Sequence, residues 1–203
     1  MHILLNSTPL PRHLFWRLVV ALPLLGSCSG NGSSGDAVDT AMAQNEKKID
    51  TADITQKQEA DAEFLVKSTS NALLEVELGK LAQARATAPD VRSYGARLVP
   101  QRLELLATLR ALAAAKGLTV PAALGSDEQE AYHEASTQTG AQLDKQLMAL
   151  LVKAQKQDED AFDDMSDDAY DGDIRGFAAK FHGPVEEQLD AAKEAADAAE
   201  KLP

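Results

Sequence analysis

Residues 89–116 read PDVRSYGARLVPQRLELLATLRALAAAK. The large apolar residues of this stretch recur at the three- and four-residue spacing of one helix face, namely at Val91, Tyr94, Leu98, Leu105, Leu109 and Leu112. Pro89 suits the first turn of a helix, and Gly117 suits its end. The pattern predicts one long amphipathic helix, in which Pro100 is expected to introduce a kink.

Similar apolar spacing predicts three further long helices, over about 60–87, over about 140–166, and from the turn at 171–173 to about Lys201. Aromatic residues make up 4% of the chain, which disfavours a sandwich of sheets, and no strand-like alternation competes. Long helices joined by short loops favour an all-α, antiparallel four-helix bundle.

Local signals refine this arrangement. Ser126, followed three residues later by Gln129, is typical of a capping box and predicts a short extra helix to about Thr137, between the second and third long helices. Gly183-Pro184 is expected to divide the last long helix into two segments.

The N-terminal region indicates export. Residues 1–27 contain Arg12, Arg17 and no acidic residue, followed by an apolar run, Leu-Gly-Ser and then Cys28, the only cysteine. This ending resembles a bacterial lipobox, so we expect 1–27 to be a lipoprotein signal peptide and Cys28 to be lipidated. An ordinary cleaved signal with a chance cysteine is the alternative. Ser29 follows the cysteine and favours sorting to the outer membrane over retention in the inner membrane, with the domain facing the periplasm.

The rest of the chain is acidic. Removing Arg12 and Arg17 with the signal changes the formal net charge from −12 to −14, which disfavours a nucleic-acid partner. A Gly/Ser-rich segment covers residues 29–35, and Asp36 to about Gln58 is polar. We expect residues 28–58 to form a flexible tether, whose second part is either unstructured or a loosely helical lead-in, before a domain at 59–203.

Three motifs resemble one family: Asp61-Ala-Glu-Phe-Leu65, Glu75-Val-Glu-Leu-Gly-Lys-Leu-Ala82 and Phe177-Ala-Ala-Lys180. They are similar to the bacterial ferritin-like "domain of unknown function 4142", over about residues 58–195. The resemblance implies an exported, often lipid-anchored, four-helix bundle whose biochemical role is not established. The family pattern has histidines at three positions where this chain has Arg102, Gln155 and Gln188. The resemblance therefore does not imply a metal site in this chain.

The residues themselves single out these positions as well, because they are polar residues near the middles of the predicted long helices. Glu75, Arg102, Gln155 and Gln188 would converge in one central layer of an antiparallel bundle. One interpretation is a metal-free network, with a buried Glu75–Arg102 pair completed by the two glutamines. The other is that Arg102 extends to solvent along its aliphatic stem and that Gln155 lies on a boundary face.

The chain lacks the residues of the commoner reactive sites. Ferritin-like di-iron centres need glutamates and Glu-x-x-His motifs, whereas only His133 and His182 follow residue 28, so we expect no metal and no cofactor. The acidic run 157–173 does not fit a calcium loop and is interpreted as a solvated face. No phosphate loop, nucleophile elbow or zinc motif is present, so we expect no catalytic residue.

These observations predict a non-enzymatic cell-envelope lipoprotein, attached to the membrane through Cys28. The tethered bundle would bind an envelope protein partner or contribute to stress tolerance. Two alternatives remain: a divergent metal-binding ferritin-like protein, and a carrier that holds a small ligand in the bundle core.

Overall fold

The computed structural model describes residues 36–50 and 56–201, so the predicted signal peptide, Cys28 and the segment 29–35 lie outside the described residues. The described residues form helices and no strand, which confirms the all-α prediction. The helices are α1 (Ala37–Asp50), α2 (Gln56–Arg85), α3 (Pro89–Ala115), α4 (Ser126–Thr137), α5 (Gly140–Asp168) and α6 (Gly172–Glu200).

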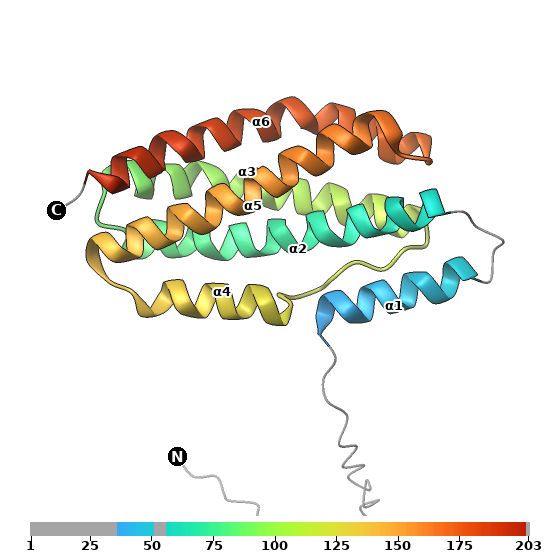
Figure 1. The fold of residues 1–203 in the computed structure, drawn as a ribbon, viewed down its shortest axis with the longest axis horizontal. Coiled ribbons are helices and arrows are strands. Elements are labelled where there is room, and N and C mark those ends of the chain that lie inside the picture. Colours follow the sequence, from blue (N-terminus) through green and yellow to red (C-terminus); the bar gives the residue numbers. More distant parts are fainter. Residues whose placement is uncertain (1–35, 51–55, 202–203) are drawn as a thin grey trace, which may run out of the picture. The chain divides into compact units, whose positions relative to one another are not determined.

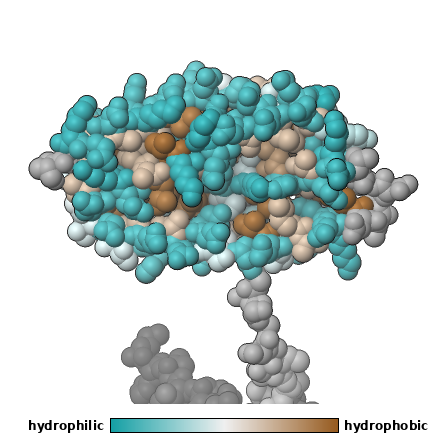
Figure 2. All heavy atoms as spheres, viewed as in Figure 1, coloured by the Kyte–Doolittle hydropathy of each residue, from teal (hydrophilic) through white to brown (hydrophobic). Residues whose placement is uncertain are grey.

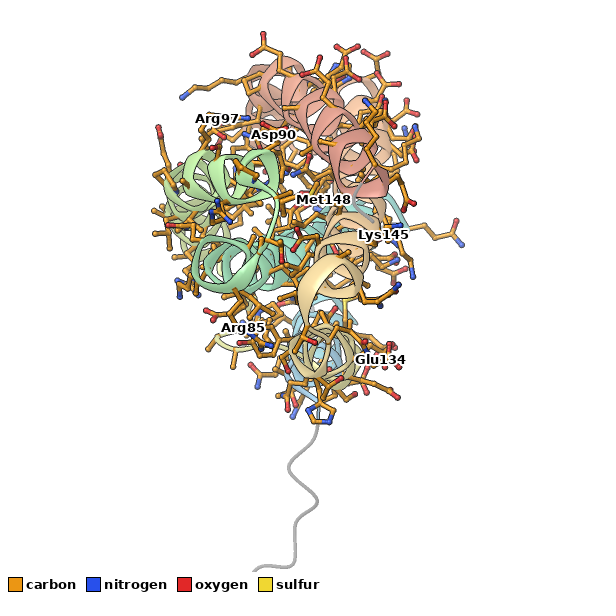
Figure 3. All side chains as sticks on the ribbon, turned by 90° about the vertical axis from the view of Figure 1, so that its left-hand side faces the viewer. Arg85, Asp90, Arg97, Glu134, Lys145 and Met148 are labelled. Carbon is orange, nitrogen blue, oxygen red and sulfur yellow. The ribbon has the colours of Figure 1, made fainter. Side chains whose placement is uncertain are left out.

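The four long helices form the body of a helical bundle (Figure 1). Helix α2 packs mainly on α3 and α5 mainly on α6, and the two pairs meet through α2–α5 and α3–α6 contacts. Helices α1 and α4 lie outside this body, where both contact α2. In the end-on view of Figure 3, Met148 lies among the side chains enclosed by the long helices, and Lys145 points outward.

Both prolines are accommodated within helices. Helix α3 continues through Pro100, and α6 continues through Pro184, so the expected division of the last helix is wrong. A proline removes one backbone hydrogen bond, but α6 buries apolar side chains both before and after Pro184, including Phe177, Val185 and Leu189. This burial holds the two halves against the same neighbours.

The segment before α2 is more ordered than a flexible tether. From Asp36 the chain forms α1, in which Ala41 and Ile49 are buried. The buried Asn45 donates from Nδ2 to the Thr119 carbonyl at 2.8 Å and accepts from the Thr119 N–H at 2.7 Å. Residues 37–50 are therefore helical, which was one of the two expectations for this segment. A domain that begins at residue 59 would leave out this packed helix.

The start of α4 corrects the predicted capping box. Ser126 is the first helical residue and its side chain does not cap the helix. Instead the Asp36 carboxylate accepts hydrogen bonds from the Ser126 backbone N–H and from its hydroxyl. These bonds, with the one from the Ser126 backbone foremost, lower the pKa of Asp36 to about 2. Since Asp36 also accepts from the Val38 N–H, one carboxylate caps both α1 and α4.

Two further carboxylates bind backbone N–H groups of the connections between helices, across the bundle. Asp144 of α5 is buried and accepts from the backbone N–H groups of residues 87–88, where α3 begins. Asp61 of α2 accepts from the N–H groups of residues 170–171, in the turn between α5 and α6. Each bond satisfies a donor that a helix or turn leaves open, and also fixes how two helices meet.

Helices α2 and α3 approach closely where each has a glycine. A Cβ on Gly95 would lie 2.7 Å from the Gly79 carbonyl oxygen and 2.9 Å from the Ala82 Cβ, and one on Gly79 would lie 2.8 Å from Val99 Cγ2. The absence of a side chain at both positions therefore permits this helix spacing. Gly79 belongs to the Glu-Val-Glu-Leu-Gly motif, which gives that motif a packing role.

We predict that Gly95→Ala lowers the free energy of unfolding by about 1–3 kcal/mol, because the added methyl meets backbone. The control is Gly176→Ala on α6, where nothing lies within 4 Å of the added Cβ. There alanine should be neutral or raise the free energy of unfolding by up to about 1 kcal/mol, through its helix propensity. Urea titrations of both variants measure the difference, and equal changes would contradict the close-approach argument.

Candidate functional site: a buried ionic cluster beside an acidic groove

The centre of the bundle holds a buried arginine between two buried carboxylates. Arg102 on α3 has an exposed fraction of 0%. Its Nε lies 2.6 Å from Oε2 of Glu75 on α2, and its Nη2 donates to Glu75 Oε1 at 3.2 Å. Its Nη1 lies 3.3 Å from Oδ2 of Asp158 on α5. The Nε and Nη1 groups are not aligned for hydrogen bonds with these oxygens, so those two contacts are ion pairs.

Three further side chains complete this ionic cluster. Asn71 on α2 donates from Nδ2 to Asp158 Oδ1 at 3.0 Å. The buried Gln155 donates from its amide to the hydroxyl of Tyr94, which is itself 2% exposed. The cluster thus joins α2, α3 and α5 through polar contacts in the interior.

The structure brings together three of the four residues predicted for the central layer. Glu75, Arg102 and Gln155 are fully buried, and Glu75 interacts with both Arg102 and the side chain of Gln155, whereas Gln188 is half-buried. Within the described part of the chain, no side-chain hydrogen bond joins Gln188 to the other three. It lines a separate cavity of about 150 Å³ together with Tyr94.

The sequence interpretation missed Asp158, Asn71 and Tyr94 as members of the cluster. Asp158 follows Gln155 by three residues and Asn71 precedes Glu75 by four, so each shares a helix face with a residue that had been predicted. This spacing was the available signal. Tyr94 was assigned to the apolar face of its helix, where its ring does lie, and its hydroxyl gave no separate signal.

Burial sets the electrostatics of the cluster. Desolvation raises the pKa of Glu75 to about 8, although Arg102 acts in the opposite direction and the charge of Asp158 adds to the rise. Desolvation also raises the pKa of Asp158, against the effects of Arg102 and Asn71. Two carboxylates share one guanidinium, so the charge of the cluster balances when one of the two carboxyl groups is protonated.

The cluster divides the apolar core into two parts. On α3, Leu98 belongs to one apolar cluster and Leu105 to the other, with Arg102 between them along the helix. On α5, Leu151 and Phe162 occupy the same two clusters, on either side of Gln155 and Asp158. The ionic cluster is therefore a polar layer across the bundle, enclosed by hydrocarbon on both sides.

These residues do not fit the metal centre of ferritin-like bundles. In the described ranges, no three His, Cys, Asp or Glu side chains are placed to hold a metal ion. The two central carboxylates face the guanidinium of Arg102, which is a fixed positive charge where a cation would have to bind. Neither carboxylate could coordinate a metal ion without losing its ion pair with Arg102.

An open groove of about 550 Å³ lies beside the cluster, between α1, α2, α4 and α5. Asn71 and Asp158 line this groove and also belong to the ionic cluster. Ser68 and Ser70 line it as well; both are buried, and their hydroxyl oxygens have no hydrogen-bond partner in the described structure. On the face of the molecule shown in Figure 2, hydrophilic side chains dominate and paler or apolar residues are visible between them.

Fold and site together define an all-helical bundle with a buried ionic cluster at its centre. The chain belongs to the family described as "Domain of unknown function (DUF4142)", whose model matches residues 43–195. The match begins within α1, covers α2, α3 and α5, and ends within α6. No curated protein and no solved structure matched the chain. Within the described ranges, no helix has the length and apolar character needed to cross a membrane.

We predict that Arg102→Ala lowers the free energy of unfolding by about 3–5 kcal/mol, because it leaves two buried carboxylates without their cation. The control is Arg97→Ala, on the same helix but exposed, which should cost less than about 0.5 kcal/mol. Urea titrations with matched m-values test this difference. Small and equal losses would show that the cluster does not stabilise the fold.

Proposed function

We propose that this chain is a non-enzymatic, lipid-anchored protein of the cell envelope, which binds a partner there or supports stress tolerance. Its long helices would form an antiparallel four-helix bundle of the ferritin-like kind. The observation that carries the proposal is the position of Arg102, whose guanidinium is buried between Glu75 and Asp158.

The pairing of the helices supports the bundle. Short connections join α2 to α3 and α5 to α6, and these are also the two most extensively packed pairs. Short loops between neighbouring helices favour an antiparallel order. An internal ion pair at the centre would then hold the register of the helices, where ferritin-like enzymes place reactive metal.

The sequence before α1 supports the location. Cys28 lies outside the described residues and ends a lipobox-like segment, and seven residues separate it from Asp36. A stretch of that length spans at most about 25 Å even when fully extended. Because α1 packs on α2 and is held by Asn45, lipidation at Cys28 would keep the bundle near the membrane surface.

We predict that Cys28→Ala releases a folded protein from the membrane fraction, because the lipid attachment needs the thiol. Fractionation of cells followed by immunoblotting measures the location, and circular dichroism of the released protein verifies its helical fold. The matched control is Ser27→Ala, which keeps a small residue before the cysteine and should stay membrane-bound. A Cys28→Ala protein that remains in the membrane fraction would refute the anchor.

We predict that the full chain, purified in a non-ionic detergent, retains close to no iron or manganese after loading and dialysis. Arg102 is the physical reason, because its charge opposes a cation at the two central carboxylates. Elemental analysis gives the metal content per chain. A stoichiometric, tightly held ion would favour the alternative function, a divergent metal-binding ferritin-like protein.

A further inference from the structure

The ionic cluster contains two acidic groups and one cation. Glu75 of α2 and Asp158 of α5 both face Arg102 of α3, and all three residues have an exposed fraction of 0%. If both carboxyl groups were ionised, the cluster would carry one unbalanced negative charge in the interior of the bundle. A buried charge without a partner is costly, and protonation of either carboxyl group removes it.

The other groups around the cluster do not supply a second cation. Tyr94 of α3 is buried, and desolvation, followed by the charge of Glu75, raises the pKa of its hydroxyl, which therefore stays neutral. Among the described residues, α6 has no buried ionisable side chain. The charged side chains farther out are exposed or half-buried, so water and salt screen them. They are Lys67, Arg97, Glu128, Lys153, Asp160 and Asp164.

Burial sets the pH range in which the extra proton is held. Desolvation, with a smaller effect from the charge of Asp158, raises the pKa of Glu75 from 4.5 to about 8, against the opposing effect of Arg102. The proton belongs to the pair, because desolvation raises the pKa of Asp158 as well. Between these limits the folded chain holds a proton that the unfolded chain lacks. The stabilisation is complete below pH 4.5 and is lost as the pH rises to about 8.

We propose that the cluster is a pH-sensitive switch, which takes up one proton when the bundle folds and destabilises the bundle when it releases that proton at mildly alkaline pH. The two carboxylates then repel each other across the guanidinium, and this repulsion acts between α2 and α5. Asp158 also lines the open groove, so the cluster lies close to water. The switch goes beyond the proposed envelope function, and it does not depend on the lipid anchor.

The test is urea unfolding of the full chain in a non-ionic detergent, at pH values from about 5 to about 9. Uptake of one proton predicts that the folding equilibrium constant falls by up to about tenfold per pH unit up to about pH 8, and more shallowly above it. Infrared spectroscopy gives a second measurement. The carbonyl band of a protonated carboxyl group should be present at about pH 6.5, where exposed carboxyl groups are ionised, and should disappear at alkaline pH.

Two variants assign the proton to the cluster. Glu75→Gln and Asp158→Asn each replace one carboxylate by an uncharged group of similar shape, and each leaves one carboxylate paired with Arg102. Both should lose the fall in the folding constant between about pH 5 and 8, and both should lose the infrared band. The matched control is Glu104→Gln, which changes an exposed side chain on α3 and should keep the slope and the band of the parent chain.

Two results would overturn the proposal. One is a parent chain whose folding constant does not fall over this pH range, or which shows no protonated carboxyl band at about pH 6.5. The other is a slope that persists unchanged in both cluster variants, which would assign it to groups elsewhere, such as His133 and His182. If neither cluster variant folds, the slope and the band of the parent chain still decide the question.

Discussion

The desolvation of Arg102 is the constraint on which the rest of the bundle depends. A guanidinium cannot be removed from water without oxygen partners, so Glu75 and Asp158 must reach it from two other helices. Because those partners are short side chains fixed by backbone position, their distances set where α2 and α5 lie relative to α3. The apolar clusters on either side exclude water from the contact, which strengthens it and makes an error in register costly.

Carboxylates at the ends of the helices add a second set of register contacts. Asp36 caps α1 and the distant α4, and Asp61 and Asp144 accept from backbone N–H groups of connections distant in the chain. A cap within one helix stabilises that helix alone, but a cap from another helix also fixes the relation between the two. Ionic contacts at the centre and capping bonds at the ends therefore restrain the bundle along its length.

The sequence predicted the long helices well, because each buries an apolar face with regular spacing. It also singled out Glu75, Arg102 and Gln155, since a polar residue flanked by apolar helical neighbours is conspicuous. Asp158 was missed because it stands in an acidic run whose other members are mostly exposed, so composition hid one buried residue among solvated ones. Helix α1 was underestimated for a similar reason, because Ala41, Asn45 and Ile49 give it a narrow buried face. No pattern within α4 could show that Asp36, which is distant in sequence, would cap it.

Asp158 connects the interior to the surface of the bundle. Its Oδ2 faces Arg102, its Oδ1 accepts from Asn71, and both Asn71 and Asp158 line the acidic groove. The residue whose carboxylate balances the central guanidinium therefore also lies at the edge of the groove. Since that carboxylate is fully buried, a change in its charge or position is weakly screened and is felt by α3 through Arg102.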